Sequence, residues 1–268
     1  MKDSSDLNDL NHHLPAIEQA ASLLHRRRSV LFITGAGISA DSGLPTYRGV
    51  DGLYNINNTQ DGMSIEDALS ADIMQREPAI TWKYLSQIEE ACRGAKFNRA
   101  HEVIAEMEDQ LERVWTLTQN VDGLHHAAGS KNVIDIHGDI HNLRCVTCKF
   151  SHSVENFSRL TIPPYCPDCG SVMRPDVVLF GEILPQAKLD LLYDELNKGF
   201  DYVFTVGTTS VFPYIAYPVE LAKRQGHPTV EINPGETAVS HLVDIKLRLS
   251  AGDGLNLIWT CYQDGQVR

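Results

Sequence analysis

The chain has 268 residues, 43% of them hydrophobic and 22% charged, which suffices for an ordinary core and excludes a disordered chain, a fibrous repeat or a coiled coil. Its 23 basic and 35 acidic side chains give a formal net charge of −12, which argues against nucleic-acid binding through a general basic surface. No apolar stretch approaches the ~18 residues of a membrane span, and the polar first residues lack the features of a signal peptide, so a cytoplasmic protein with reduced thiols is expected.

The alternation of apolar runs and amphipathic stretches predicts an α/β fold with a parallel sheet. Residues 14–28 carry apolar side chains at helical spacing and end in three arginines, which suits a helix C-terminus. Short apolar runs typical of buried parallel strands occupy residues 30–33, 114–117, 133–136, 202–206 and 229–232. Amphipathic stretches near residues 99–110, 186–198 and 214–225 predict helices. Each predicted strand ends in a polar or glycine-rich loop, and ligands of such sheets bind at those ends.

Two stretches interrupt this alternation. Residues 49–98 form a long insertion whose second half has helical spacing, and residues 138–175 contain four cysteines and little helical pattern. We predict that both belong to a smaller lobe inserted into a main domain made of residues 1–48, 99–137 and 176–268.

A glycine-rich loop follows the first predicted strand. Gly35, Gly37 and Ala40 have the G-x-G-x-x-A form of a dinucleotide loop, in which glycines let the backbone approach a diphosphate and aim N–H groups at it. A dehydrogenase would continue into a second strand that ends in an acidic residue about 20 positions on. Here the chain runs into Leu44–Pro45 and Arg48 instead, which counts against hydride transfer and provides a cation for a phosphate.

Polar residues also follow the next two predicted strands. The segment TQNVDGLH, residues 118–125, places amides and a carboxylate where they can hold a carboxamide or a ribose hydroxyl. His137 follows the strand predicted at 133–136, and an imidazole has a pKa suited to general-base work near neutral pH.

Four cysteines form two Cys-x-x-Cys pairs, and 17 residues separate the pairs. The four residues are Cys145, Cys148, Cys166 and Cys169. This separation falls in the range of about 15–20 residues typical of tetrahedral zinc sites. Four thiolates leave no open position, so the predicted Zn²⁺ is structural; the alternative is four buried or redox-active thiols. Cys92 and Cys261 are expected to be buried thiols.

Taken together, these residues resemble the sirtuin family, the NAD-dependent protein-lysine deacylases. The matching stretches, in the family's order from residue 34 to the low 230s, are GAGISADSGLPTYRG, TQNVDGLH, the His137–Gly138 pair, the two cysteine pairs, RPDVVLFGE, VGTTS and EIN. The resemblance implies a Rossmann-like NAD-binding domain with a small lobe composed of a helical module, residues 49–98, and a zinc module, residues 138–175. It also implies NAD as co-substrate, one structural Zn²⁺, and acyl-lysine segments of proteins as partners, without nucleic acid or membrane.

The resemblance further implies roles for individual residues. His137 would be the general base, with Asn120 as the second catalytic residue. NAD would contact Gly35, Ala36, Gly37, Ser39, Ala40, Tyr47, Arg48, Tyr54, Gln119, Asn120, Val121, Asp122, Gly207, Thr208, Thr209, Asn233 and Asp253. Substrate peptide would add as a strand to the edge formed by Val178, Phe180, Gly181 and Glu182.

The implied reaction has two stages. The acyl-lysine oxygen attacks C1′ of the nicotinamide ribose, and nicotinamide leaves. His137 then deprotonates a ribose hydroxyl, which attacks the resulting imidate, and water completes the release of free lysine and O-acyl-ADP-ribose. Burial and close placement of the reacting groups would supply most of the acceleration.

The chain departs from the family pattern at several positions. Tyr47 stands where strong deacetylases usually have Phe, which bears on rate and product partition, and Val121 replaces the commoner Ile. Pro213 comes one position earlier than the usual proline, so the loop before it is expected to differ.

The helical module lacks the Tyr-x-x-Arg pair with which some relatives bind succinyl or malonyl carboxylates. Tyr84 is followed three residues later by Gln87, and Trp82 by Leu85. Without an Arg fork for a carboxylate, weak desuccinylase activity is expected. A Trp82/Leu85 wall would favour acetyl or longer apolar acyl groups; the alternative is that Trp82 belongs to the core.

Three alternative functions stay open. A mono-ADP-ribosyltransferase of the same fold would share the NAD site, and Tyr47 is the residue that favours it. A non-enzymatic NAD-sensing module is disfavoured by His137 and Asn120, since a binder needs no base. A Rossmann oxidoreductase is disfavoured by the missing second-strand acidic residue.

Overall fold

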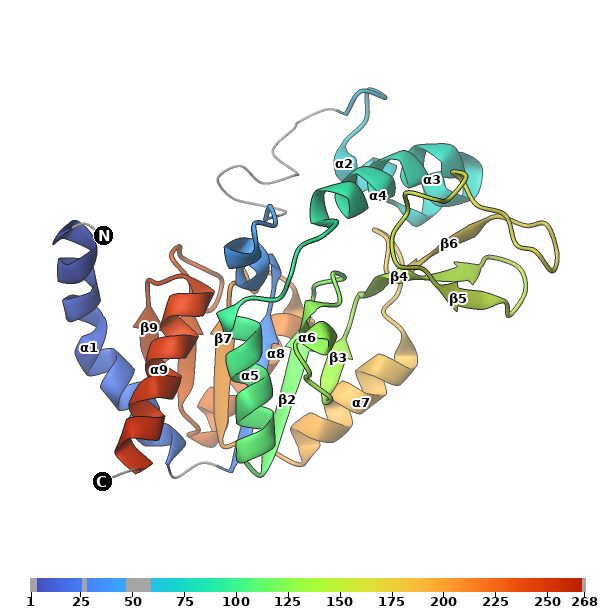
Figure 1. Cartoon of the computed structure of the whole chain (residues 1–268). Coiled ribbons are helices and arrows are strands. Elements are labelled where there is room, and N and C mark those ends of the chain that lie inside the picture. The colour runs from blue at the N-terminus through green and yellow to red at the C-terminus, as the bar shows by residue number, and fades with distance from the viewer. Residues whose placement is uncertain (1–3, 26–27, 47–58, 267–268) are drawn as a thin grey trace.

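The main domain is built around a six-stranded sheet in the order β3-β2-β1-β7-β8-β9, with all neighbouring strands parallel (Figure 1). The computed structural model describes residues 4–25, 28–46 and 59–266. The strands are β1 (Ser29–Thr34), β2 (Arg113–Thr118), β3 (Val133–Asp135), β7 (Tyr202–Val206), β8 (Thr229–Ile232) and β9 (Ile245–Leu247). Numbered by chain position, this is the doubly wound order 3-2-1-4-5-6, in which the winding direction reverses between β1 and β7.

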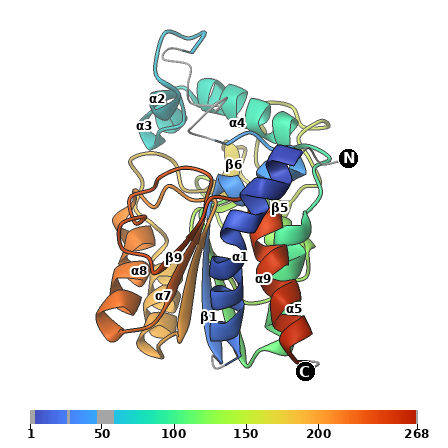
Figure 2. The ribbon, with the colours of Figure 1, turned by 90° about the vertical axis from the view of Figure 1, so that its left-hand side faces the viewer.

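Helices cover both faces of the sheet (Figures 1 and 2). One face is packed by α1 (Ser4–Leu24), α5 (Arg99–Gln110) and α9 (Ala251–Gln266), and the other by α7 (Gln186–Asn197) and α8 (Pro213–Gln225). Along β1, Val30 and Phe32 point into the hydrophobic core beneath α1, α5 and α9, whereas Leu31 and Ile33 point into the core beneath α7 and α8. A strand buried on both sides must be apolar throughout, which explains its uninterrupted run.

The smaller lobe joins the two sequence insertions around one core. Its helices are α2 (Ile65–Ala68), α3 (Ala71–Arg76) and α4 (Pro78–Cys92). Its antiparallel sheet has the order β5-β4-β6, with β4 (Gly138–Cys145), β5 (Ser151–Ser153) and β6 (Met173–Val177). Trp82 on α4 is fully buried, its ring lies 5.3 Å from that of Phe157, and its Nε1 donates to the carbonyl of Met173 at 2.8 Å. Trp82 therefore belongs to the core, and the expected Trp82/Leu85 wall of an acyl pocket is wrong.

The predicted fold class is confirmed, and all five predicted strands are present. The sequence analysis missed β9 and α9, and α1 ends at Leu24, before the arginines that were expected to close it. Arg28 instead precedes β1, where its N–H donates to Asp201 at 3.1 Å. Within the described residues, no helix combines the length and apolar character needed to span a membrane.

Candidate active site

The loops after β1 and β7 meet at the point where the winding of the sheet reverses. Gly35 N donates to the Val206 carbonyl at 3.3 Å, and Gly37 N donates to the Gly207 carbonyl at 2.8 Å. A Cβ on Gly37 would lie 2.6 Å from the Cα of Gly207, which itself has φ of +60°. Close contact between two backbones therefore requires these glycines, and their N–H groups are bonded within the protein. In this conformation neither N–H is aimed at a ligand, and the predicted contact of this loop with a diphosphate stays a prediction.

The 3-10 helix η1 (Ala36–Ser42) carries Ser39 into contact with the loop after β2. Ser39 Oγ donates to Asp122 Oδ2 at 2.8 Å and accepts from Asn120 Nδ2 at 3.2 Å. Burial raises the pKa of Asp122, against hydrogen bonds from Leu124 N and Ser39 that lower it. The Asn120 side chain is 5% exposed and its Oδ1 has no hydrogen-bond partner among the described residues. A buried acceptor of this kind is suited to a ligand N–H, such as that of a carboxamide.

A pocket opens above these residues, between the two lobes of the chain. Its lining comprises Ala36, Ser39, Leu44, Pro45, Ile88, Cys92, Asn120, Val121, Asp122 and Ile140. Ile88 and Cys92 come from α4, and the sequence analysis did not predict either as a pocket residue. Burial, together with the charges of Asp122 and Glu89, raises the pKa of Cys92 to about 11, so its thiol is neutral at pH 7. Apolar walls with one orphaned amide oxygen fit a flat carboxamide ring such as nicotinamide.

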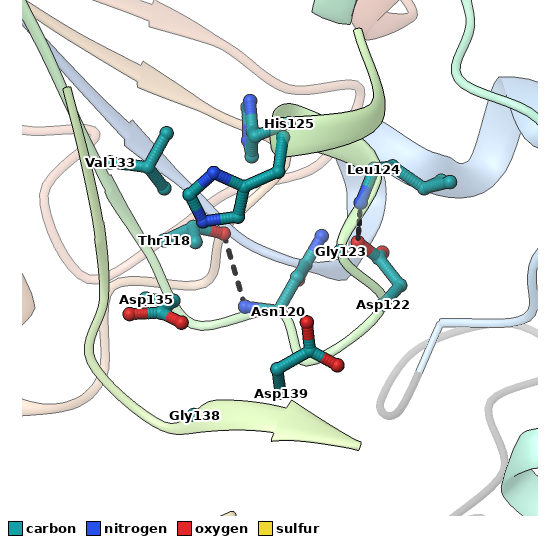
Figure 3. Close-up of a pocket in the computed structure, with 11 residues that line it drawn as sticks. Thr118, Asn120, Asp122, Gly123, Leu124, His125, Val133, Asp135, Gly138 and Asp139 are labelled. Atoms are coloured by element: carbon teal, nitrogen blue, oxygen red, sulfur yellow. Dashed lines mark hydrogen bonds between the residues drawn. The ribbon is translucent and has the colours of Figure 1, made fainter. Parts of the chain in front are cut away.

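A second hollow lies beneath the loop after β2 (Figure 3). There Asn120 N donates to Thr118 Oγ1 at 3.1 Å and Leu124 N donates to Asp122 Oδ1 at 3.0 Å, which fixes two turns of the loop. Asp139 also faces this hollow, and its charge adds to the raised pKa of Asp122. The carboxylate of Asp139 accepts a hydrogen bond from the His141 ring and raises the pKa of His141, so a cation forms more readily at this edge of the site.

His137 lies at the end of β3 with both ring nitrogens bonded. Its Nδ1 is 2.9 Å from the carbonyl oxygen of Gln119, and its Nε2 is 2.6 Å from the hydroxyl of Tyr214. A carbonyl only accepts, so the neutral ring carries its proton on Nδ1 and its lone pair on Nε2. Burial lowers the pKa of His137, which keeps the ring neutral and able to act as a base.

The loops after β7 and β8 are linked to the rest of the site. Gln119 Nε2 donates to Thr208 Oγ1 at 2.7 Å, and Asn233 Nδ2 donates to the Thr208 carbonyl at 3.2 Å. The Thr209 carbonyl accepts from Ala238 N at 3.0 Å. Asp253, a predicted NAD contact, lies in the first turn of α9 with its side chain exposed.

Sequence-predicted NAD contacts thus gather at the carboxyl ends of four strands. Those at the ends of β1, β2, β7 and β8 are Gly35, Ala36, Gly37, Ser39, Ala40, Gln119, Asn120, Val121, Asp122, Gly207, Thr208, Thr209 and Asn233. Tyr47, Arg48 and Tyr54 lie outside the described residues.

The predicted peptide edge is partly bonded within the chain. Val178 N donates to the His137 carbonyl at 2.8 Å, while Phe180 N donates to the Leu69 carbonyl and the Phe180 carbonyl accepts from Ala71 N, each at 3.0 Å. A peptide strand would therefore have to use other backbone groups of this segment, and its binding here stays a prediction.

Glu182 shapes the same edge from inside. Its carboxylate contacts the guanidinium of Arg174 at 2.5 Å and accepts from Leu179 N at 2.8 Å. Arg174 is 4% exposed and also donates to the Val177 carbonyl at 2.5 Å. Buried, multiply bonded ion pairs fix local geometry, so Glu182 holds the edge in place.

The four predicted zinc ligands come together in the smaller lobe. The sulfur atoms of Cys145, Cys148, Cys166 and Cys169 all lie within 4.8 Å of one another. The Cys145–Cys169 and Cys148–Cys166 sulfur pairs are 3.5 Å and 3.6 Å apart. Zn–S bonds of ~2.3 Å in a tetrahedron require sulfur separations of about 3.8 Å, so the cluster fits one zinc ion with no open position.

A doubly wound sheet with a pocket at the carboxyl ends of β1 and β2 and a buried imidazole nearby is typical of an enzyme that uses a dinucleotide. A separate four-thiolate metal module accompanies it here. Comparison with known proteins agrees. The Sir2 family model matches residues 35–213. The chain is 48% identical over 241 residues to NAD-dependent protein deacylase 2 of Pseudomonas aeruginosa, which covers 89% of this chain and 93% of the relative. It is 46% identical over 236 residues to NAD-dependent protein deacylase 2 of Pseudomonas syringae pv. tomato, which covers 87% of this chain and 95% of the relative.

Solved structures are similar over nearly the whole chain. A Sir2 homologue in complex with NAD superposes with a TM-score of 0.83 at 34% identity, covering 92% of this chain and 94% of the other. A Sir2 protein with deacetylated p53 peptide and 3′-O-acetyl ADP ribose gives a TM-score of 0.81 at 28% identity, covering 91% of this chain and 97% of the other. The chain belongs to the Sir2 family, the sirtuins. The predicted family and enzyme class, an NAD-dependent protein deacylase, are confirmed.

Proposed function

We propose that this NAD-dependent protein deacylase removes acyl groups, chiefly acetyl, from lysine side chains of proteins and releases nicotinamide, O-acyl-ADP-ribose and free lysine. The observation that carries the proposal is the bonding of His137: the Gln119 carbonyl holds its Nδ1 proton, which leaves Nε2 as a neutral base. This base lies at the sheet end where the predicted NAD contacts gather. A protein that only bound NAD would have no use for such a base.

Bound NAD supplies the ADP-ribosyl group that accepts the acyl group as nicotinamide leaves. The chain's own contribution begins with the pocket that includes Ile88, Cys92 and Asn120. Its apolar walls exclude water from the ring, and Asn120 Oδ1 is free to accept a carboxamide N–H. Ser39 holds both Asn120 and Asp122 in place, so the polar side of the pocket is ordered before a ligand arrives.

His137 acts as general base on a ribose hydroxyl in the second stage of the reaction. Its fixed tautomer orients Nε2, and its lowered pKa keeps the lone pair available at neutral pH. The zinc ion takes no part in these steps, since four thiolates saturate it. It would instead stabilise the lobe that contains β4 and β6, and β4 begins at Gly138 directly after the base.

The described residues support a neutral acyl group. The Tyr84 hydroxyl and the Lys83 ammonium both contact Asp61, at 2.5 Å and 2.8 Å, so neither is free for a succinyl carboxylate. Among the described residues that line the pocket, none is basic and Asp122 is acidic. Within the described part of the chain, a carboxylate-bearing acyl group would therefore meet no cation in this pocket.

Three further proposals accompany this function. A cytoplasmic location is supported by six cysteines that are all free of disulfides, four of them in the zinc cluster. Acyl-lysine segments are the proposed protein partners. The division at residues 48/49, 98/99, 137/138 and 175/176 is proposed as the domain organisation, although the last position falls inside β6 (Met173–Val177).

The test is mass spectrometry of the purified protein with NAD and peptides that carry acetyl-, succinyl- or long-chain-acyl-lysine. Deacylated peptide together with O-acyl-ADP-ribose supports the proposal, with acetyl faster than succinyl. If NAD is consumed while the peptides stay acylated and protein gains ADP-ribose, the chain is a mono-ADP-ribosyltransferase instead. A His137→Ala variant that kept full acyl transfer would remove His137 from its role as base.

A further inference from the structure

The first turn of α8 brings an aromatic side chain into contact with His137. Helix α8 begins at Pro213, in the first helical position that proline favours, and Phe212 precedes it as the N-cap. Tyr214 follows in the first turn, and its ring reaches His137. The sequence analysis expected a different loop here and did not predict Tyr214 as a residue of the site.

Tyr214 and His137 form a hydrogen bond whose direction is fixed. The distance between Tyr214 Oη and His137 Nε2 is 2.6 Å. Because the Nδ1 proton of His137 is donated to the Gln119 carbonyl, Nε2 carries the lone pair and accepts the hydrogen bond from the phenol. Burial raises the pKa of Tyr214 to about 12, so the phenol keeps this proton at neutral pH.

Neighbouring aromatic rings hold the phenol in place. The Phe212 ring stacks on the Tyr214 ring at 5.6 Å with an interplanar angle of 15°, and it meets the His137 ring edge-on at 6.1 Å and 86°. Tyr214 also meets His137 nearly perpendicularly, at 81°. Contacts of this kind add stability beyond simple burial, so the three rings form a unit that orders the hydroxyl.

An imidazole nitrogen has one lone pair, and the lone pair of His137 Nε2 points to Tyr214. A substrate hydroxyl therefore reaches the base directly only if Tyr214 leaves, whereas through Tyr214 it reaches the base without any rearrangement. We propose that Tyr214 relays the proton between the substrate's ribose hydroxyl and His137, an inference that rests on the proposed deacylase function.

The relay balances without a further reactant. The ribose O–H bond breaks as its proton bonds to Tyr214 Oη, and the Tyr214 O–H bond breaks as its proton bonds to His137 Nε2. The phenol stays neutral, His137 becomes an imidazolium, and the ribose oxygen becomes the nucleophile. The new imidazolium N–H then donates to the phenol oxygen, so the hydrogen bond survives with its direction reversed.

The test compares wild type with Tyr214→Phe, which keeps the ring and removes only the hydroxyl. Tyr217→Phe is the matched control, because Tyr217 lies one turn further along α8, is 37% exposed, and contacts Tyr193 and Arg224 away from His137. Two rates are measured with an acetyl-lysine peptide: exchange of labelled nicotinamide into NAD, which reports the first stage, and formation of O-acyl-ADP-ribose, which reports the second.

The relay predicts that Tyr214→Phe keeps nicotinamide exchange near the wild-type rate and loses about 100-fold or more in product formation, because general acid–base catalysis contributes about 10²–10⁴-fold. Tyr217→Phe should match wild type in both assays. Product formation that is unchanged or faster in Tyr214→Phe would overturn the relay, and a faster rate would identify Tyr214 as a plug that must leave. Wild-type protein without either activity would instead refute the proposed function itself.

A second readout separates the relay from a role in merely holding the imidazole. Single-turnover product formation by wild type is measured in mixtures of H₂O and D₂O. Two protons that move together give a curved dependence on the deuterium fraction, as the relay requires. A straight line overturns it, because Tyr214 would then only hold the ring.

Discussion

Substitution of Gly37 by alanine tests the backbone contact at the reversal point of the sheet. The new Cβ would lie 2.6 Å from the Gly207 Cα and 2.8 Å from the Gly207 carbonyl oxygen, and neither backbone atom can rotate away. Overpacking of this kind costs about 1–3 kcal/mol. Separation of the loops would also break the 2.8 Å bond from Gly37 N to the Gly207 carbonyl, worth about 0.5–1.5 kcal/mol. We expect the free energy of unfolding to fall by about 1.5–4.5 kcal/mol, the sum of these two effects.

Gly235→Ala is the matched control, since its Cβ would have only an ordinary 3.7 Å contact with Asn233 Oδ1 and the position has no positive φ. Denaturant unfolding, followed by tryptophan fluorescence, measures both variants against wild type, and titration calorimetry measures their affinity for NAD. Gly37→Ala should be destabilised and bind NAD more weakly, while Gly235→Ala should lie within about 0.5 kcal/mol of wild type. A Gly37→Ala protein as stable as the control would show that the two loops do not need their close contact.

Three further predictions concern the metal, the base and the pocket. Removal of zinc by a chelator should release one metal ion per chain, expose Trp82 to solvent and abolish activity. A zinc-free protein with unchanged Trp82 fluorescence and full activity would contradict a structural role of the metal. Because burial lowers the pKa of His137, the acid limb of the pH profile of kcat/KM should have its midpoint below pH ~6.5, the ordinary imidazole value. A midpoint above that value would show that another group governs the limb. Cys92→Met places a larger side chain in the pocket and should lower kcat/KM for NAD about tenfold, whereas Cys92→Ala should leave kcat/KM nearly unchanged. Equal effects of the two substitutions would place Cys92 outside the binding site.

The sequence predicted the sheet well because its strands are buried on both faces. A run such as residues 30–33 must be apolar throughout to enter two cores, and such runs stand out against amphipathic helices. Strand β9 was missed because it has three residues with Lys246 in the middle, too short for any period. Helix α9 was missed because Gly252 and Gly254 near its start resemble a loop. A Cβ on Gly254 would lie 2.5 Å from Ile232 Cγ2, so this glycine allows the helix to pack closely on β8.

The site was predictable where its residues follow strands in a recognisable order. Asn120, Asp122 and His137 needed only the rule that parallel strands end at one edge of a sheet. Ile88 and Cys92 could not be found in this way, since they lie on a helix of the other lobe and reach the pocket only through tertiary packing. The local sequence did mark the segment that contains Tyr214, through the shifted proline. Contact of Tyr214 with His137 depends on how α8 packs against the sheet, which the local sequence does not show.

The position of His137, the proposed base, links it to the four-cysteine cluster. His137 is the last residue before β4, the strand that carries the first zinc ligand, Cys145, at its other end. The His137 carbonyl accepts from Val178 N, just beyond β6, and a Cβ on Gly138 would lie 1.9 Å from the Asp176 carbonyl oxygen. The turn at the base therefore exists only while β4 and β6 are paired, and zinc holds the far end of that pair. Loss of zinc should accordingly misplace the imidazole even where the six-stranded sheet stays folded.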